Sequence, residues 1–233
     1  MMRRALARSL LVAAGASSVA LGALAFAHTA TGSAIGHGLL RMARGGCPFG
    51  YDQAASPEQR ERARAQFAAK HRGEARAPNR PSLGFTLDHT TRAQVVEQLS
   101  AHGVRCSQGH GLSDLTCLHV PSRALLGVAA TDPERTLWFT FGTHDQLLSV
   151  IAVSRDSNAQ TIGNAFRSVQ SSLSEQAGAP TATSGSADSR TLANGLLRQA
   201  SSEFRFQNYY AVERAANMGN AYVLTEEYRS LPD

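Results

Sequence analysis

Four residues near the middle of the chain have side chains that could bind a metal ion or form a covalent link. Cys106, His110, Cys117 and His119 follow the spacing C-x3-H-x6-C-x-H. Two thiolates and two imidazoles are ligands that Zn²⁺ prefers, so one hypothesis is a zinc site. The spacing matches no standard pairing of zinc ligands, and we therefore favour a different role for the two cysteines.

The favoured hypothesis is a disulfide between Cys106 and Cys117. Both cysteines lie on segments that we expect to be extended and adjacent, where their sulfur atoms can approach to bonding distance. A disulfide also requires an oxidising compartment, which the N-terminal segment predicts.

Nucleophilic catalysis is the third hypothesis for this group of residues. Cys47 or Cys106 would be the nucleophile, and His89 or His110 would then be the base. The sequence lacks the context that such enzymes show, and it holds no serine-hydrolase, zinc-protease, P-loop or dinucleotide-binding motif. We therefore assign no catalytic residue, no metal ligand and no cofactor.

Residues 1–27 have the features of a targeting segment. The first nine residues contain three arginines and no acid, and residues 10–27 run without a charge to Ala25-Phe26-Ala27, the small-x-small pattern that signal peptidase accepts. The uncharged run is also close to the minimum length of a membrane-spanning helix. We expect either a cleaved signal peptide or a retained membrane anchor. In both cases the arginines stay in the cytoplasm and the body of the protein is exported.

The composition changes twice between the targeting segment and the globular part. Residues 28–55 are rich in glycine and small residues and predict a flexible tether. Ser56-Pro57-Glu58 predicts a helix start, and residues 56–82 form a basic helix and a linker that contains two prolines. This helix lacks the bulky apolar face that insertion into lipid requires, so we favour a solvated helix over a lipid-binding one.

We expect residues 83–233 to form one α+β domain. Thr91 and Gln94 fit a capping box at the start of a helix that Gly103 ends, and Asn158 caps a second helix that ends at Gly178. Alternating or apolar runs predict strands at 83–87, 104–107, 112–120, 123–131, 137–141, 147–153, 203–212 and 221–228. A helix followed by strands, used twice, predicts a two-layer sandwich of helices packed on an antiparallel sheet, with two α-β repeats at the level of pattern.

The acidic residues give no catalytic pair in this interpretation. Glu226 and Glu227 are neighbours on a strand and therefore point to opposite faces. Glu213 is placed on a polar strand face with Glu203 and Arg205. The net charge of +5 is concentrated at the N-terminus, which argues against a nucleic-acid-binding protein.

The run Asp88-His89-Thr90-Thr91-Arg92-Ala93-Gln94-Val95-Val96 resembles the G-M-T-x-x-Q-V helix start of small outer-membrane assembly lipoproteins of the SmpA/OmlA type. Those proteins, and the β-lactamase-inhibitor-like modules of similar shape, pack helices on an antiparallel sheet and act by binding other proteins. This chain departs from the pattern because it has no lipobox, and His-Gly-Val-Arg-Cys stands where that family has Leu-Gly-x-Pro. The resemblance implies a fold and a binding role, and no functional residues.

These observations together predict an exported or membrane-tethered envelope protein. Its expected role is that of a non-enzymatic protein-binding or structural module, with an envelope protein as partner and no nucleic acid. Residues 10–27 would supply any membrane anchoring. The alternative function is a cysteine- or metal-dependent envelope enzyme.

Overall fold

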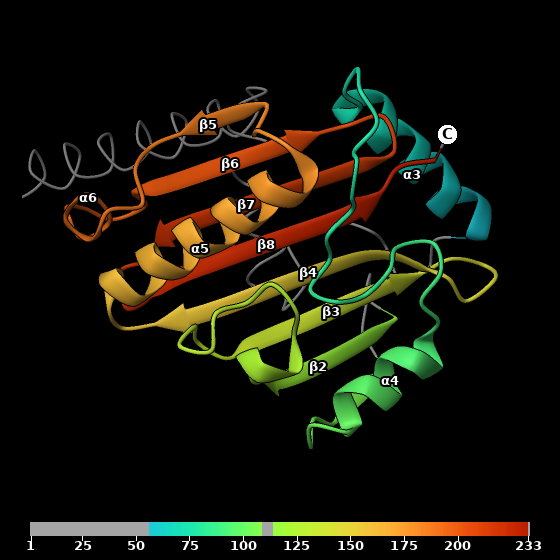
Figure 1. Ribbon diagram of the computed structural model, residues 1–233, viewed down its shortest axis with the longest axis horizontal. Helices are drawn as coiled ribbons and strands as arrows, with labels where there is room; N and C mark the ends of the chain where they lie inside the picture. Colours follow the sequence, from blue (N-terminus) through green and yellow to red (C-terminus); the bar gives the residue numbers. More distant parts are fainter. Residues whose placement is uncertain (1–55, 109–113, 233) are drawn as a thin grey trace, which may run out of the picture. The chain divides into compact units, whose positions relative to one another are not determined.

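The computed structural model describes residues 56–108 and 114–232 (Figure 1). Four expectations fall outside the described residues: the signal or anchor at 1–27, the tether at 28–55, and the roles of Cys47 and His110. We expected residues 56–82 to precede the globular domain, and in the structure they pack on it.

A single antiparallel sheet of eight strands forms the centre of the fold, in the order β1-β2-β3-β4-β8-β7-β6-β5 (Figure 1). Its first four strands are β1 (Cys106–Gln108), β2 (Leu115–Val120), β3 (Arg135–Phe141) and β4 (Leu147–Asp156). The last four are β5 (Ala182–Ser184), β6 (Gln199–Arg205), β7 (Tyr209–Asn217) and β8 (Tyr222–Ser230). The predicted α+β class is confirmed.

The sheet consists of two meanders that meet at their last strands. Helix α4 (Arg92–Ser100) precedes β1 to β4, and α5 (Ala159–Ala177) precedes β5 to β8, with the short α6 (Ser189–Ala193) between β5 and β6. Strand β4 pairs with β8 from Ser149↔Arg229 to Asp156↔Tyr222. A ladder of eight residue pairs therefore joins the two halves.

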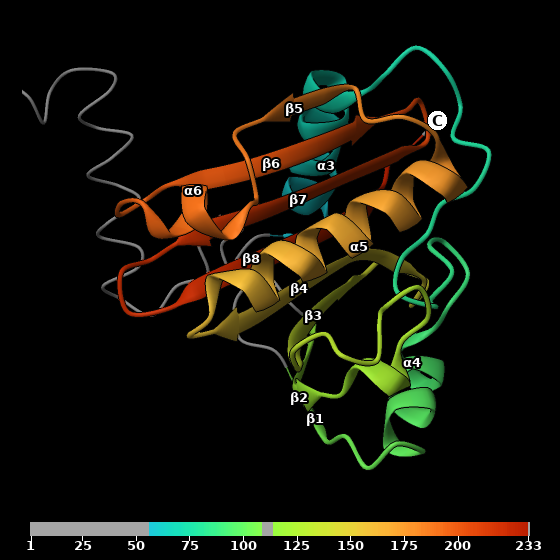
Figure 2. The same cartoon turned by 60° about the vertical axis from the view of Figure 1, so that its left-hand side comes forward.

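One continuous apolar core lies between the sheet and helices α4, α5 and α6 (Figure 2). Helix α5 places Ile162, Phe166, Val169 and Leu173 on the sheet at the spacing that the sequence predicted. The side chain of Asn158 accepts a hydrogen bond from the Gln160 backbone N–H at its start, and Gly178, with φ of 110°, follows its end. Helix α4 adds Val95 and Leu99 and begins with the expected capping box of Thr91 and Gln94.

Helix α3 (Pro57–His71) packs on the opposite face of the sheet. Tyr210 and Val212 point to this face because they alternate along β7 with Tyr209 and Ala211, which belong to the main core. The Phe67 ring meets the Tyr210 ring edge to face with centroids 5.1 Å apart. Helix α3 therefore packs on the face of the sheet opposite to the main core.

The sulfur atoms of Cys106 and Cys117 form the disulfide that the sequence predicted, with an S–S distance of 2.02 Å. The two residues are register partners on β1 and β2, so the bridge lies across the first strand pair of the sheet. It closes a loop that includes residues 109–113, which lie outside the described part of the chain.

Three strand predictions are wrong. Residues 83–87 form turns rather than a strand, and residues 123–131 hold part of the 3₁₀ helix η1 (Ser122–Ala124) and further turns. The predicted strand 203–212 is a hairpin, in which β6 ends at Arg205 and β7 begins at Tyr209. A hairpin reverses the chain, so face assignments carried across residues 206–208 do not hold.

Among residues 56–108 and 114–232, no helix combines the length and apolar character that crossing a membrane requires.

Replacing both cysteines, as Cys106→Ala/Cys117→Ala, is expected to lower the free energy of unfolding by about 3 kcal/mol, because the bridge restricts the unfolded chain over a short loop. Urea denaturation without reductant measures this change. Reductant should shift the wild-type midpoint and leave that of the double variant unchanged, while Cys47→Ala serves as the control with wild-type stability. Equal midpoints for the wild type and the double variant would contradict the structural role of the bridge.

Candidate functional site

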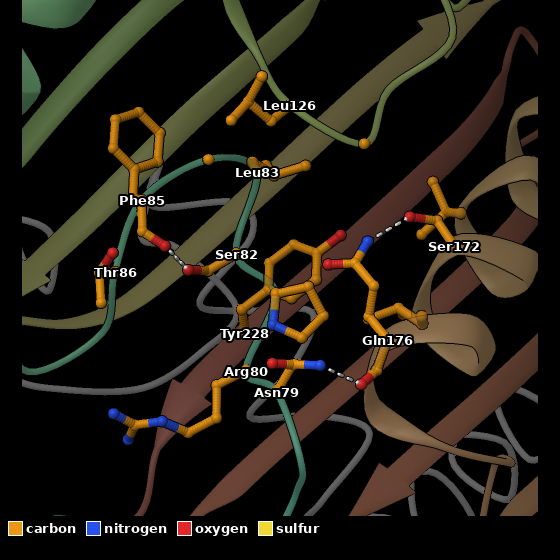
Figure 3. A pocket seen from close by; sticks show the side chains of 15 residues that line it. Asn79, Arg80, Ser82, Leu83, Phe85, Thr86, Leu126, Ser172, Gln176 and Tyr228 are labelled. Carbon is orange, nitrogen blue, oxygen red and sulfur yellow. Dashed lines mark hydrogen bonds between the residues drawn. The ribbon is translucent and has the colours of Figure 1, made fainter.

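A pocket of about 350 Å³ opens between α5, the loop at residues 126–127 and the segment 79–86, which we call the strap (Figure 3). Its apolar lining comes from Leu83, Phe85, Leu126, Val169 and Leu173. Its uncharged polar lining comes from Asn79, Ser82, Thr86, Ser172, Gln176 and Tyr228. The volume lies at the small end of ligand pockets, and the mixed lining is typical of them.

Local hydrogen bonds and buried side chains hold the strap in place. The Ser82 hydroxyl donates to the Phe85 carbonyl, and the buried Tyr209 hydroxyl donates to the Pro81 carbonyl at 2.6 Å. Burial raises the pKa of Tyr209, so this hydroxyl keeps its proton. Leu83 has a φ of 62° and is almost fully buried. A leucine in the left-handed region is strained, and its burial offsets that cost.

Asp88, just after the strap, links Arg80 of the strap to two other parts of the fold, β8 and α3. Its carboxylate accepts hydrogen bonds from Arg80 and from the Ser230 hydroxyl, each at 2.6 Å, and Arg64 of α3 lies 3.8 Å away. Arg80 is the charged residue of the pocket lining, and Figure 3 shows its guanidinium extending away from Gln176. Its pairing with Asp88 leaves a lining suited to an uncharged ligand.

The polar part of the wall on the α5 side consists of amide and hydroxyl groups. Gln176 donates from Nε2 to the Ser172 hydroxyl at 2.9 Å, and its own backbone carbonyl accepts a hydrogen bond from Asn79 at 3.2 Å. The amide of Asn79 therefore ties the strap to the helix. The Ser172 hydroxyl, which accepts from Gln176, retains its own proton for donation.

Beneath the pocket, Tyr228 leads to a buried group of charged residues. Its hydroxyl donates to Glu226 Oε2 at 2.7 Å, and Arg135 Nε donates to Glu226 Oε1 at 2.8 Å. Arg135 also lies 3.3 Å from Asp132. Arg135 and Glu226 are buried, and their mutual hydrogen bonding offsets part of the cost of removing two charges from water.

Glu213 faces Glu226 directly across the β7–β8 ladder and is fully buried. Burial first, and the negative charge of Glu226 second, raise the pKa of Glu213 to about 9. Neither of its side-chain oxygens has a hydrogen-bond partner among the described residues. Glu213 is therefore protonated at neutral pH. Ionising it would place a second negative charge opposite Glu226 in the interior, with no hydrogen bond from the described residues to stabilise that charge.

The residues that the sequence singled out lie elsewhere. Cys106 and Cys117 are consumed by the disulfide, which removes the thiolates that both the zinc site and a Cys106 nucleophile require. His119 is exposed beside Glu134, with Nδ1 3.3 Å from Oε2, and His89 is exposed. In the described part of the chain, no group of three potential ligands from His, Cys, Asp and Glu could hold a metal.

Glu213 is the functional candidate that sequence reasoning misplaces. Alternation along a single strand assigns it to the polar face, whereas the structure turns the chain at residues 206–208 and directs Glu213 into the interior. The polar pair Gln207-Asn208 between two aromatic runs was the available signal for that turn. The prediction that Glu226 and Glu227 point to opposite faces is consistent with their partners, Arg135 and Arg229 respectively.

Comparison of the chain with protein-family models, with curated proteins and with solved structures found no match.

Glu213→Gln is expected to raise the free energy of unfolding at pH 8. The folded protein keeps the Glu213 proton up to about pH 9, whereas a glutamate in the unfolded chain releases its proton near the ordinary pKa of 4.5. Between these values the unfolded state binds fewer protons, so wild-type stability falls as pH rises, by at most about 1.4 kcal/mol per pH unit from this residue. Glutamine has no such proton, so the free energy of unfolding of Glu213→Gln should depend less steeply on pH. Urea denaturation at several pH values between 5 and 8 measures this dependence.

Glu175→Gln, on the exposed side of α5, provides the matched control and should keep the wild-type dependence on pH. An unchanged slope in Glu213→Gln would show that another group is responsible.

Proposed function

We propose that this protein is an exported, non-enzymatic binding module of the cell envelope. We further propose that its pocket receives an apolar side chain from an extended segment of a partner protein. The observation that carries the second proposal is the pocket itself, an apolar hollow with uncharged hydrogen-bonding groups around it, next to an exposed leucine.

The chemistry of the lining suits a peptide. An extended peptide presents an apolar side chain together with backbone N–H and C=O groups that must be hydrogen-bonded. Leu173 and Val169 offer apolar surface for the side chain, while Ser172 and Gln176 offer hydroxyl and amide groups for the backbone. A charged ligand would meet no unpaired opposite charge in this lining, because Arg80 is bonded to Asp88.

Leu126 adds apolar surface at the rim. It is 71% exposed, although its backbone N–H donates to the Leu83 carbonyl and holds it at the strap. An exposed leucine beside a hollow is typical of a protein contact, in which burial of the side chain contributes to affinity.

We also propose that the two halves are α-β repeats, arranged as in the SmpA/OmlA-type and β-lactamase-inhibitor-like modules that the run 88–96 resembles. In support, each half is a helix followed by a four-stranded meander, and the two meanders pair through β4 and β8. In the resembling run, Thr91 and Gln94 form the capping box of α4. The helices of both halves contribute to one core on one face of the sheet, as a two-layer arrangement requires.

The binding role is tested with a displayed library of short peptides selected on the purified full-length protein. We expect enriched peptides to share one apolar position and to bind at least tenfold more weakly to Ser172→Trp, because the indole fills the pocket. The control is Ser171→Trp, whose side chain lies on the exposed face of α5 and which should bind like the wild type. Fluorescence anisotropy measures the affinities, and circular dichroism verifies folding.

A second pair of variants tests the same binding site without placing a large side chain at Ser172. Leu126→Asp should weaken binding of the same peptides. Leu118→Asp should not, because Leu118 is an exposed leucine that lies on β2, away from the pocket lining. Failure to enrich any peptide, or equal losses in a variant and its control, would refute the pocket as the binding site.

The export half of the proposal is tested by fusing alkaline phosphatase to the C-terminus of the full chain in a bacterial host. We expect phosphatase activity, since the enzyme needs disulfides that form outside the cytoplasm, and deletion of residues 1–27 should abolish it. Activity that survives the deletion would contradict the targeting role of that segment.

A further inference from the structure

Three large apolar side chains are exposed together at one end of the sheet. Leu196 and Leu197 are each 67% exposed and Met218 is 46% exposed. They lie in the link between α6 and β6 and in the turn between β7 and β8, at the end of the sheet where α6 is found (Figure 1). We call residues 194–198 and 217–220 the leucine tip.

Hydrogen bonds join the two segments of the tip into one unit. The backbone N–H of Leu197 donates to the Asn217 carbonyl, and that of Asn217 donates to the Arg198 carbonyl, both at 2.9 Å. The buried Asn217 side chain donates to the Leu192 carbonyl of α6 at 2.9 Å. A Cβ placed on Gly219 would lie 3.0 Å from Leu196 Cδ1, so the two turns touch. Because the backbone is held by these bonds, the leucines are presented outward by a defined structure.

One basic side chain lies in the tip and a second lies beside it. Arg190 of α6 and Arg198 are exposed. The neighbouring acid, Asp188, is the N-cap of α6, where its carboxylate accepts hydrogen bonds from the backbone N–H and the hydroxyl of Thr191. The described residues at this tip thus combine exposed leucines with two cations and one engaged carboxylate.

We infer that the leucine tip docks on an anionic lipid surface, with Leu196 and Leu197 entering the interfacial region and Arg190 and Arg198 contacting the headgroups. Apolar side chains inserted beside basic ones are the pattern of interfacial membrane contacts. A protein partner of ordinary size would bury about 800 Å² on each side, which three side chains do not supply. This surface is separate from the pocket, so the inference does not rest on the proposed peptide binding.

The lipid contact differs from the one considered for the basic helix at 56–72. In the structure, Phe67 of that helix is packed against Tyr210, and Arg64 lies 3.8 Å from Asp88. Phe67 of α3 is therefore engaged within the fold, whereas the apolar side chains of the tip are exposed.

The test places a tryptophan reporter at the tip of the full-length protein and measures its quenching by brominated lipid. Leu197→Trp is made together with Trp138→Phe, because Trp138 is the single tryptophan of the chain. We expect strong quenching in vesicles of phosphatidylcholine and phosphatidylglycerol, and weaker quenching in phosphatidylcholine alone. Arg190→Gln and Arg198→Gln should each lower the docking constant about fivefold, since each removes one cation from the surface.

Leu118→Trp in the same background is the control, because Leu118 is 52% exposed but lies on β2. The comparison holds whether or not residues 1–27 insert into the vesicles, since both reporters share that segment. If Trp138→Phe does not fold, Trp138 is retained and its own quenching in the wild-type protein is subtracted. Equal quenching at positions 197 and 118, or no quenching at 197, would overturn the inference and assign the tip to a protein contact or to none.

Discussion

The pairing of β4 with β8 is the constraint on which the rest of the structure depends. It joins two separate meanders into one sheet, and it brings residues more than ninety positions apart in the sequence onto one face. Arg135 of β3 reaches Glu226 of β8 across β4, where the intervening register positions hold the small residues Ala152 and Ser154. A larger side chain at either position would occupy the space that the guanidinium crosses.

This seam also sets the charge balance of the core. Arg135 interacts with both Asp132 and Glu226, so one cation already balances two carboxylates. Glu213 is a third carboxyl group in the same region, with no cation of its own among the described residues. The third carboxylate stays protonated because burial and Glu226 both disfavour its charge. Buried ion pairs of this kind contribute little net stability, but removing one partner is costly because the other charge is left unpaired. Tyr228 connects this group to the pocket, so the strand pairing that positions Glu226 also positions the floor of the pocket.

The pocket depends on long-range contacts of a different kind. Its strap has no regular secondary structure and is positioned by Tyr209 of β7, by Ser230 next to the C-terminus and by Gln176 of α5. The sequence around Leu83 reads as a short strand because it is apolar, yet its backbone turns with a positive φ at both Leu83 and Asp88. Its hydrogen-bonding partners come from distant segments, and a local pattern cannot identify them.

Some features followed from local patterns. The spacing of Ile162, Phe166, Val169 and Leu173 predicted α5 and its buried face, the capping residues predicted where α4 and α5 begin, and Leu137 to Phe141 predicted β3. The Cys106–Cys117 bridge followed as well, because its partners are close in sequence and lie on adjacent strands. The prediction of a single strand at 203–212 was wrong, because the alternation of apolar and polar residues looks the same in one long strand and in two strands joined by a short turn.

The amino-acid sequence by itself determined helices α3, α4 and α5, most of the strands, the α+β class and the disulfide, since each depends on residues that are close along the chain. The tertiary structure alone decided that Glu213 lies in the interior opposite Glu226, that α3 packs against Tyr210, and that the strap and α5 enclose a pocket. The first two outcomes depend on which face each strand buries, and a single misplaced turn between β6 and β7 is enough to reverse the faces of Glu213 and Tyr210.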